Sequence, residues 1–164
     1  MDSGRKAAAV DYRRVHSPLG SRFVDLFDEV LRLNGRLIAA SKMTTRVSGL
    51  RPPHWIVLSA VVCAGEPPTV PRIGRALGQA RQSVQRHADH LVDGGYLTWI
   101  DNPDHLRAKR LIATDKGLRT YDTGNRESAI WIDRIVKGLN AEQLDAAVTL
   151  LRELRHRVEA DARR

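Results

Sequence analysis

Amide and guanidinium groups gather on one side of a short helix predicted to begin near Arg81. The apolar residues Val84, Ala88 and Leu91 recur at intervals of four and three residues and therefore face inward. A helix in the major groove of DNA reads base edges with such polar groups, because glutamine suits adenine and arginine suits guanine. The outward residues expected to contact DNA are Arg81, Gln82, Ser83, Gln85 and Arg86. The alternative is an ordinary solvated helix face.

A second short helix is predicted just before this one, over residues 70–77. Val70, Ile73 and Leu77 form its buried side, and Gly78 supplies the backbone freedom at which it ends. Two short helices joined by a tight turn are typical of a DNA-reading head, whose second helix enters the groove by its N-terminal part. We therefore expect Gln82 and Ser83 to reach deepest.

A basic β-hairpin is predicted directly after the Gly94–Gly95 pair. Its strands cover residues 96–101 and 109–113, and a turn signal lies between them at residues 102–105. We expect Arg107 and Lys109 to contact a phosphate or the minor groove beside the reading helix, where neutralised phosphates contribute most of the salt-dependent affinity. A solvated hairpin without a DNA contact is the alternative.

Three segments in this order resemble the MarR family of winged-helix transcriptional regulators. They are Leu77-Gly-Gln-Ala-Arg-Gln-Ser-Val-Gln-Arg86, Leu91-Val-Asp-Gly-Gly-Tyr-Leu97, and Asn102-Pro-Asp-His-Leu-Arg-Ala-Lys109 followed by Thr114-Asp-Lys-Gly117. The resemblance implies a mainly α fold with a small β-wing, a winged helix-turn-helix carried on a helical dimerisation platform. It also implies a bacterial or archaeal homodimer that binds a pseudo-palindromic double-stranded DNA operator, often tuned by a small aromatic or phenolic effector.

The sequence departs from the family pattern at three places. The recognition helix commonly begins at a serine or threonine N-cap, and Ala80 occupies that position here, so a hydrogen bond of about 1 kcal/mol is missing. The wing usually carries an aspartate two residues before the arginine that Arg107 matches, and here that residue is His105. The leucine-threonine pair before the next helix is replaced by Ala113-Thr114.

The chain is predicted to fold as one domain behind a loose basic arm. The arm covers residues 1–17, and the domain covers residues 18–164. Within it, residues 53–113 form the winged head, while residues 18–48 and 114–162 form dimerisation helices. Both of these helical segments carry apolar stripes at helical spacing, which need another helix to exclude water. Asn140 and Gln143 stand at capping-box positions for the last helix.

A small effector pocket is expected between the platform and the head. Its residues would be Phe27, His54, Trp55, Leu58 and Trp131, although any of these side chains could equally belong to the core. Cys63 follows two valines, so we expect a buried structural cysteine rather than a peroxide-sensing thiol. His87 and His90 lie three residues apart but lack further ligands at metal-binding spacing, so no metal site and no cofactor are predicted.

Charge and composition limit the class of protein. A length of 164 residues suits one domain, and a formal net charge of +8 favours a polyanionic partner. The sequence carries neither an apolar run long enough to span a membrane nor a secretory core, and its single cysteine suits a reducing compartment, so we expect a cytoplasmic protein. Motifs of the common enzyme classes are absent, so catalysis is not expected.

The most favoured function is therefore a sequence-specific DNA-binding regulator, with repression as the default for a small one-domain protein. Two alternatives stay open. One is a winged-helix adaptor that binds protein, and the other is a sequence-neutral nucleic-acid-binding protein.

Overall fold

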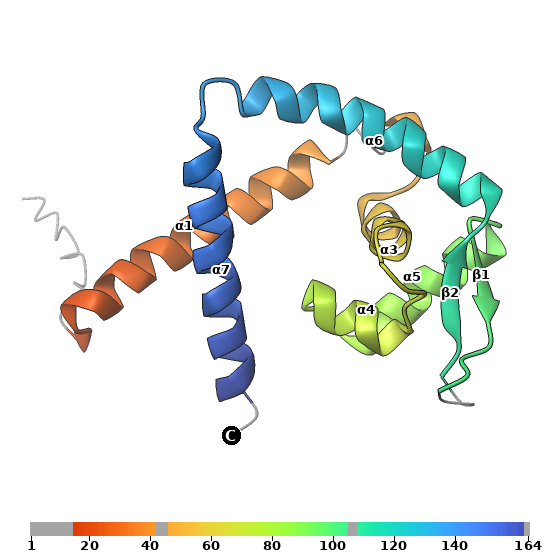
Figure 1. The fold of residues 1–164 in the computed structure, drawn as a ribbon, viewed down its shortest axis with the longest axis horizontal. Coiled ribbons are helices and arrows are strands. Elements are labelled where there is room, and N and C mark those ends of the chain that lie inside the picture. Colours follow the sequence, from red (N-terminus) through yellow and green to blue (C-terminus); the bar gives the residue numbers. More distant parts are fainter. Residues whose placement is uncertain (1–14, 42–45, 105–107, 163–164) are drawn as a thin grey trace, which may run out of the picture.

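The computed structural model describes residues 15–41, 46–104 and 108–162, and it is mostly helical with one two-stranded antiparallel sheet (Figure 1). This is the predicted fold class. Most of the predicted basic arm, together with His105 and Arg107, lies outside the described residues. The elements in chain order are α1 (Pro18–Ala40), α3 (Pro52–Val62), α4 (Val70–Leu77), α5 (Arg81–Asp93), β1 (Leu97–Ile100), β2 (Arg110–Ala113), α6 (Asp115–Ile135) and α7 (Ala141–Asp161).

The hydrophobic core lies inside the head, where α3, α4, α5 and the two strands meet. Helix α3 begins with two prolines, whose fixed φ angle and missing amide suit the first turn of a helix. It is apolar on nearly every side because it is surrounded by other elements. The buried apolar side chains are Leu50, Val57, Leu58, Val61, Val70, Ile73, Val84, Ala88, Leu91, Leu97 and Leu111.

Helices α4 and α5 form the predicted helix-turn-helix. The hydroxyl of Thr69 accepts a hydrogen bond from the amide of Arg72 at 3.4 Å and so caps the start of α4. Gly78 ends α4 at φ +62°, a left-handed conformation that residues with a Cβ rarely adopt. The chain then turns into α5, whose predicted inward residues Val84, Ala88 and Leu91 are all buried.

The wing follows α5 as predicted, with strands slightly shorter than expected. Leu97 pairs with Ala113 and Ile100 pairs with Arg110 in antiparallel register. The wing is also joined to the entrance of α4, because the amide of Leu111 donates to the carbonyl of Pro68 at 2.9 Å and Thr69 forms a β-bridge with Arg110. Backbone hydrogen bonds therefore connect β2 of the wing to the segment that leads into α4.

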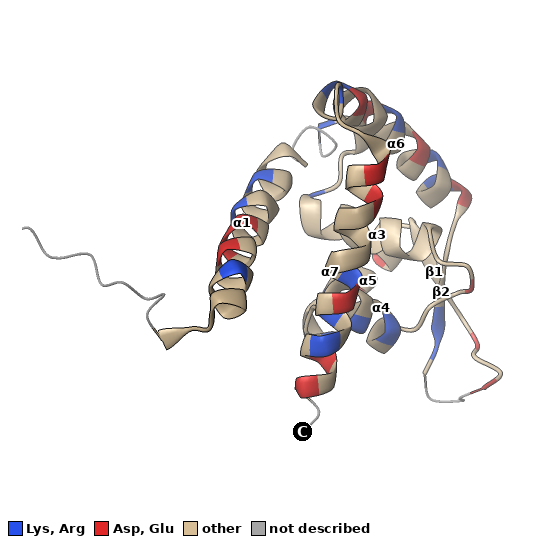
Figure 2. Ribbon diagram, turned by 60° about the vertical axis from the view of Figure 1, so that its left-hand side comes forward, with Lys and Arg blue, Asp and Glu red and all other residues tan. Residues whose placement is uncertain are grey.

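Three longer helices lie outside this head (Figure 1). Helix α6 covers one side of α3, where the rings of Trp55 and Tyr121 stack at 5.5 Å. Helices α1 and α7 cross in the view of Figure 1 but lie apart in Figure 2, and neither buries a single residue. Their apolar residues are exposed, among them Phe27, Leu33, Val148 and Leu151. Among the described helices, none combines the length and apolarity that crossing a bilayer requires.

Candidate nucleic-acid interface

The outward side of α5 carries the polar residues that the sequence singled out. Arg81, Gln82 and Arg86 are exposed, and Gln85 is half-buried beside them. Together these four side chains surround one shallow concave surface. Gln82 and Arg86 stand four residues apart, so their amide and guanidinium groups lie on the same side of the helix. This surface offers hydrogen-bond groups of the kinds that read adenine and guanine edges.

Ser83 and Gln85 already have partners within α5. The hydroxyl of Ser83 lies 3.4 Å from Nε2 of His87, and Nε2 of Gln85 donates to Oδ1 of Asp89 at 2.9 Å. These contacts hold both side chains along the helix. Gln82 and Arg86 are therefore the outermost base-reading candidates, and Ser83 is half-buried rather than at the tip of the face.

A groove of about 350 Å³ runs between α5 and the wing. Arg81 and Gln85 line one side, and Lys109 lines the other, so the structure brings these three predicted DNA contacts together. Trp99 from β1 also lines this groove and was missed in the sequence. Strand alternation places Trp99 on the same face as the buried Leu97, so the sequence pattern by itself indicates packing against the core and not a groove position. Asp89 adds one carboxylate to the same groove.

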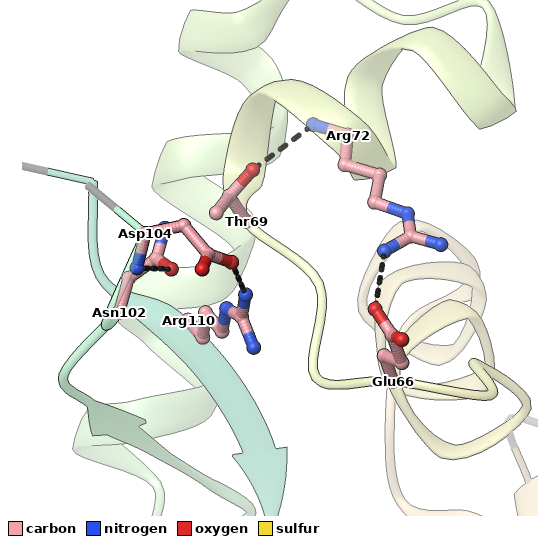
Figure 3. Close-up of polar contacts among 6 residues, drawn as sticks. All are labelled: Glu66, Thr69, Arg72, Asn102, Asp104 and Arg110. Atoms are coloured by element: carbon pink, nitrogen blue, oxygen red, sulfur yellow. Dashed lines mark hydrogen bonds and ion pairs between the residues drawn. The ribbon is translucent and has the colours of Figure 1, made fainter.

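The loop end of the wing is held by polar contacts that the sequence did not predict (Figure 3). Asp104 forms an ion pair with Arg110, and the amide of Asp104 donates to Oδ1 of Asn102 at 3.2 Å. Asp104 thus holds Arg110, and Arg107 lies outside the described residues. The figure also shows Glu66 reaching Arg72 on α4, 3.5 Å away.

Basic positions lie on both parts of the head. Figure 2 shows lysines and arginines on α4, α5 and β2. The start of α5 lacks a side-chain cap, as the sequence predicts: Ala80 has the extended backbone of an N-cap residue but no group that accepts a hydrogen bond.

Comparison with known proteins agrees with this geometry. The sequence profile of the MarR family matches residues 48–108. The uncharacterized protein Rv2011c of Mycobacterium tuberculosis is 30% identical over 125 residues, covering 76% of this chain and 82% of that protein. The chain belongs to the MarR family of winged-helix transcriptional regulators.

Solved structures of MarR-family members share the fold at low sequence identity. A MarR/EmrR family regulator from Acinetobacter sp. ADP1 superposes with a TM-score of 0.73 at 19% identity, covering 83% of this chain and 96% of that one. CouR from Rhodococcus jostii RHA1, bound to p-coumaroyl-CoA, gives a TM-score of 0.72 at 19% identity, with coverage of 80% and 92%.

Three histidines meet under the recognition helix of this MarR-family head. The ring of His54 on α3 stacks on that of His90 at 4.2 Å and meets His87 edge-on at 5.2 Å. Burial lowers the pKa of His54, and the positive charges of His90, His87 and Arg51 also lower it, so that together these effects bring it to about 4. Across residues 15–41, 46–104 and 108–162, no three His, Cys, Asp or Glu side chains are placed to hold a metal ion.

The five residues expected to form one effector pocket lie in three different places. Leu58 is fully buried in the core, and His54 lies in the α3–α5 contact. Phe27 is 50% exposed on α1, in a groove that α1 forms with α7. Only Trp55 and Trp131 share a cavity, which lies between α1, α3 and α6. The expectation of a common pocket was wrong because the order of the elements does not show which helices of the MarR fold approach one another.

Cys63 is exposed, so the expectation of a buried cysteine was wrong. Helix α3 ends at Val62, and Cys63 is its C-cap residue, outside the buried side formed by Val57, Leu58 and Val61. Its sulfur lies 3.1 Å from the hydroxyl of Tyr121 on α6. This hydrogen bond, followed by burial, raises the pKa of Tyr121 to about 12.

Proposed function

We propose that this protein binds a pseudo-palindromic operator as a homodimer, represses transcription there, and leaves the DNA when a small aromatic molecule binds. The observation that carries the proposal is the joint exposure of Gln82 and Arg86 on α5. Their neighbours Arg81 and Gln85 share a groove with the exposed Lys109 on the wing. A helix and a wing on one rigid head suit the major groove and the neighbouring backbone of a duplex.

The outer helices support a dimer. Two apolar grooves of about 450 and 720 Å³ lie along α1 and α7, and residues 75–78 at the end of α4 also line the smaller one. Phe23 and Leu26 line both grooves from α1, and Leu154 lines both from α7. Exposed apolar stripes of this length favour association, because burying them removes about 25 cal/mol of free energy per Å² of apolar surface. A second copy offers the matching stripes.

Binding is tested on DNA selected from a random pool by the full-length protein and measured by fluorescence anisotropy against excess competitor. Specific binding to a two-fold symmetric site supports the proposal. Binding that disappears under competitor indicates a sequence-neutral protein, and absence of binding indicates an adaptor.

The base-reading assignment is tested with Gln82→Ala and Arg86→Ala. Each is expected to cost about 1–3 kcal/mol at particular base pairs while leaving random-sequence binding comparatively unchanged. Arg126→Ala removes the same charge as Arg86→Ala, but from the exposed face of α6, and serves as the control. Equal discrimination in all three variants contradicts the assignment.

The dimer is tested by size-exclusion chromatography with light scattering, which measures the mass of the eluting protein. Leu151 lines the groove between α1 and α7, so Leu151→Glu is expected to give monomers. Arg152→Glu places the same carboxylate on the neighbouring exposed position and is expected to leave the dimer intact. A monomeric parent protein contradicts the proposal. Repression is tested with a reporter gene placed behind the selected site.

A further inference from the structure

The cavity shared by Trp55 and Trp131 has the size of a single ring. Its volume is about 150 Å³, and Leu37, Ala40 and Ile132 contribute apolar walls. An apolar cavity of about 150 Å³ is large enough to hold one benzene molecule. The cavity therefore suits a ligand with one six-membered ring and one small substituent.

Two indole rings form part of the lining of this cavity. Trp55 and Trp131 both line it and are both half-buried. The ring of Trp55 is held in place from behind, because it stacks on Tyr121 at 5.5 Å with an interplanar angle of 10°. The faces of indole rings carry negative electrostatic potential and attract cations more strongly than those of other aromatic side chains.

The charged residue that lines the cavity also favours a cationic ligand. Glu127 is the one acidic or basic side chain among the described residues that line it. The nearby hydroxyls are directed to the backbone: Ser128 donates to the carbonyl of Gly124 at 2.9 Å, and Ser41 donates to that of Ile38 at 2.7 Å. An anionic ligand would therefore meet a like charge and no cationic partner among these residues, whereas a cationic one would meet a carboxylate and two indoles.

We infer that this cavity binds a small aromatic cation, a single ring bearing a protonated amine, in preference to an aromatic carboxylate. The inference rests on the proposed function, in which an aromatic molecule acts as effector, and specifies the charge of that molecule. Trp55 and Trp131 enclose the ring, and Glu127 pairs with the ammonium group.

Three probes of equal ring size test the charge preference: benzylamine, benzyl alcohol and benzoate at neutral pH. Binding to the full-length protein is measured by calorimetry and by the fluorescence of a Trp99→Phe variant, in which only Trp55 and Trp131 report. Benzylamine is expected to bind at least about tenfold more tightly than benzoate, with benzyl alcohol between them.

A matched pair of variants tests the role of Glu127. Glu127→Gln is expected to bring the affinities for benzylamine and benzyl alcohol close together while leaving that for benzyl alcohol unchanged. Asp133→Asn removes the same charge from an exposed position of α6 that does not line the cavity, and it is expected to preserve the preference.

Three outcomes overturn the inference: tightest binding of benzoate, an unchanged charge preference in Glu127→Gln, or no calorimetric binding of any probe. Operator binding is measured separately with and without each probe. Release of DNA by benzoate alone overturns the inference and leaves the proposed function standing. Binding of benzylamine in the expected order without DNA release supports the charge preference and contradicts the proposed release step.

Discussion

The imidazole rings of His54 and His90 stack at 4.2 Å in the contact between α3 and the recognition helix. His87 closes the cluster from the edge, and its pKa is also lowered, by burial first and then by the positive charges of Arg86, Arg51 and His90. Every charge that acts on His54 and His87 in this contact is positive. The packing of α5 on α3 is therefore suited to neutral imidazoles.

Stability is expected to fall in mild acid because of this cluster. The folded-state pKa of His54 is about 4, below its ordinary value of 6.5, so the folded state resists protonation. The free energy of unfolding is therefore highest above the ordinary pKa and is lost as the pH falls from there toward about 4. Urea unfolding at a series of pH values measures this loss.

Two substitutions separate His54 from the other histidines in that experiment. His54→Phe keeps a ring in the stack but does not titrate, so its stability is expected to depend less on pH across the same range. His16→Gln removes an exposed histidine outside the cluster and is expected to follow the parent protein. Parallel pH curves for His54→Phe and the parent would assign the loss to other groups.

A side-chain cap at the start of α5 is expected to raise the stability of the protein. Ala80 has the backbone conformation of an N-cap residue, so a serine hydroxyl there can accept a hydrogen bond from the first turn. Ala80→Ser is expected to raise the free energy of unfolding by about 1 kcal/mol, measured by urea unfolding at fixed protein concentration. Ala80→Val adds volume without an acceptor and serves as the control. Equal gains in both variants would mean that capping is not the cause.

Gly117 marks a close approach between α6 and the short segment that joins α5 to β1. A Cβ atom at this position would overlap the carbonyl oxygen of Tyr96, which is part of the backbone and has little room to move. Gly117→Ala is expected to lower the free energy of unfolding by about 1–3 kcal/mol, as overpacking commonly does.

Gly35 provides the matched control for that substitution. It lies inside α1 with no atom of another segment near the position of a Cβ, on the side of the helix away from Phe23, Leu26 and Leu33. Gly35→Ala is expected to raise stability by about 0.5–1 kcal/mol, because alanine loses less entropy in a helix. Thermal melts of both variants give the comparison, and a stable Gly117→Ala protein would contradict the proposed overlap.

Two neighbouring basic residues at the loop end of the wing, Lys109 and Arg110, are expected to differ in DNA binding. Lys109 is exposed in the groove beside α5, whereas Arg110 is paired with Asp104 and its side chain is only 21% exposed. Lys109→Gln is expected to weaken binding to all sequences and to reduce the slope of log affinity against log salt by about 0.9, the value for one lost phosphate contact. Arg110→Gln should change this slope less. A larger effect at Arg110 would place Arg110 on the phosphate instead.

Local sequence patterns were sufficient to predict the head. The spacing of Val84, Ala88 and Leu91 gave the buried side of α5, and Gly78 marked the turn before it. Polar residues opposite that side had to be exposed, so the predicted face with Gln82 and Arg86 follows from the same periodicity. These features depend on neighbours along the chain, which is why the sequence alone reveals them.

Contacts between distant segments were not predictable in the same way. Trp55 and Trp131 line the same cavity because α6 passes over α3. Leu58, three residues from Trp55, is buried in the core instead. Cys63 is exposed because α3 ends one residue before it, and helix ends are poorly marked in an apolar run. The pairing of Asp104 with Arg110 depends on how the wing tip folds back. Each of these features depends on the path of the chain in space.

The backbone hydrogen bond from Leu111 to Pro68 and the β-bridge between Thr69 and Arg110 join the wing to the helix-turn-helix, so α5 and the wing are expected to move as one rigid unit. Under the proposed function, the bases contacted by α5 and the backbone contacted by the wing are expected to lie at a constant offset along each half-site. The length of each half-site is then expected to be set by the protein, while the spacer between half-sites is expected to vary between operators.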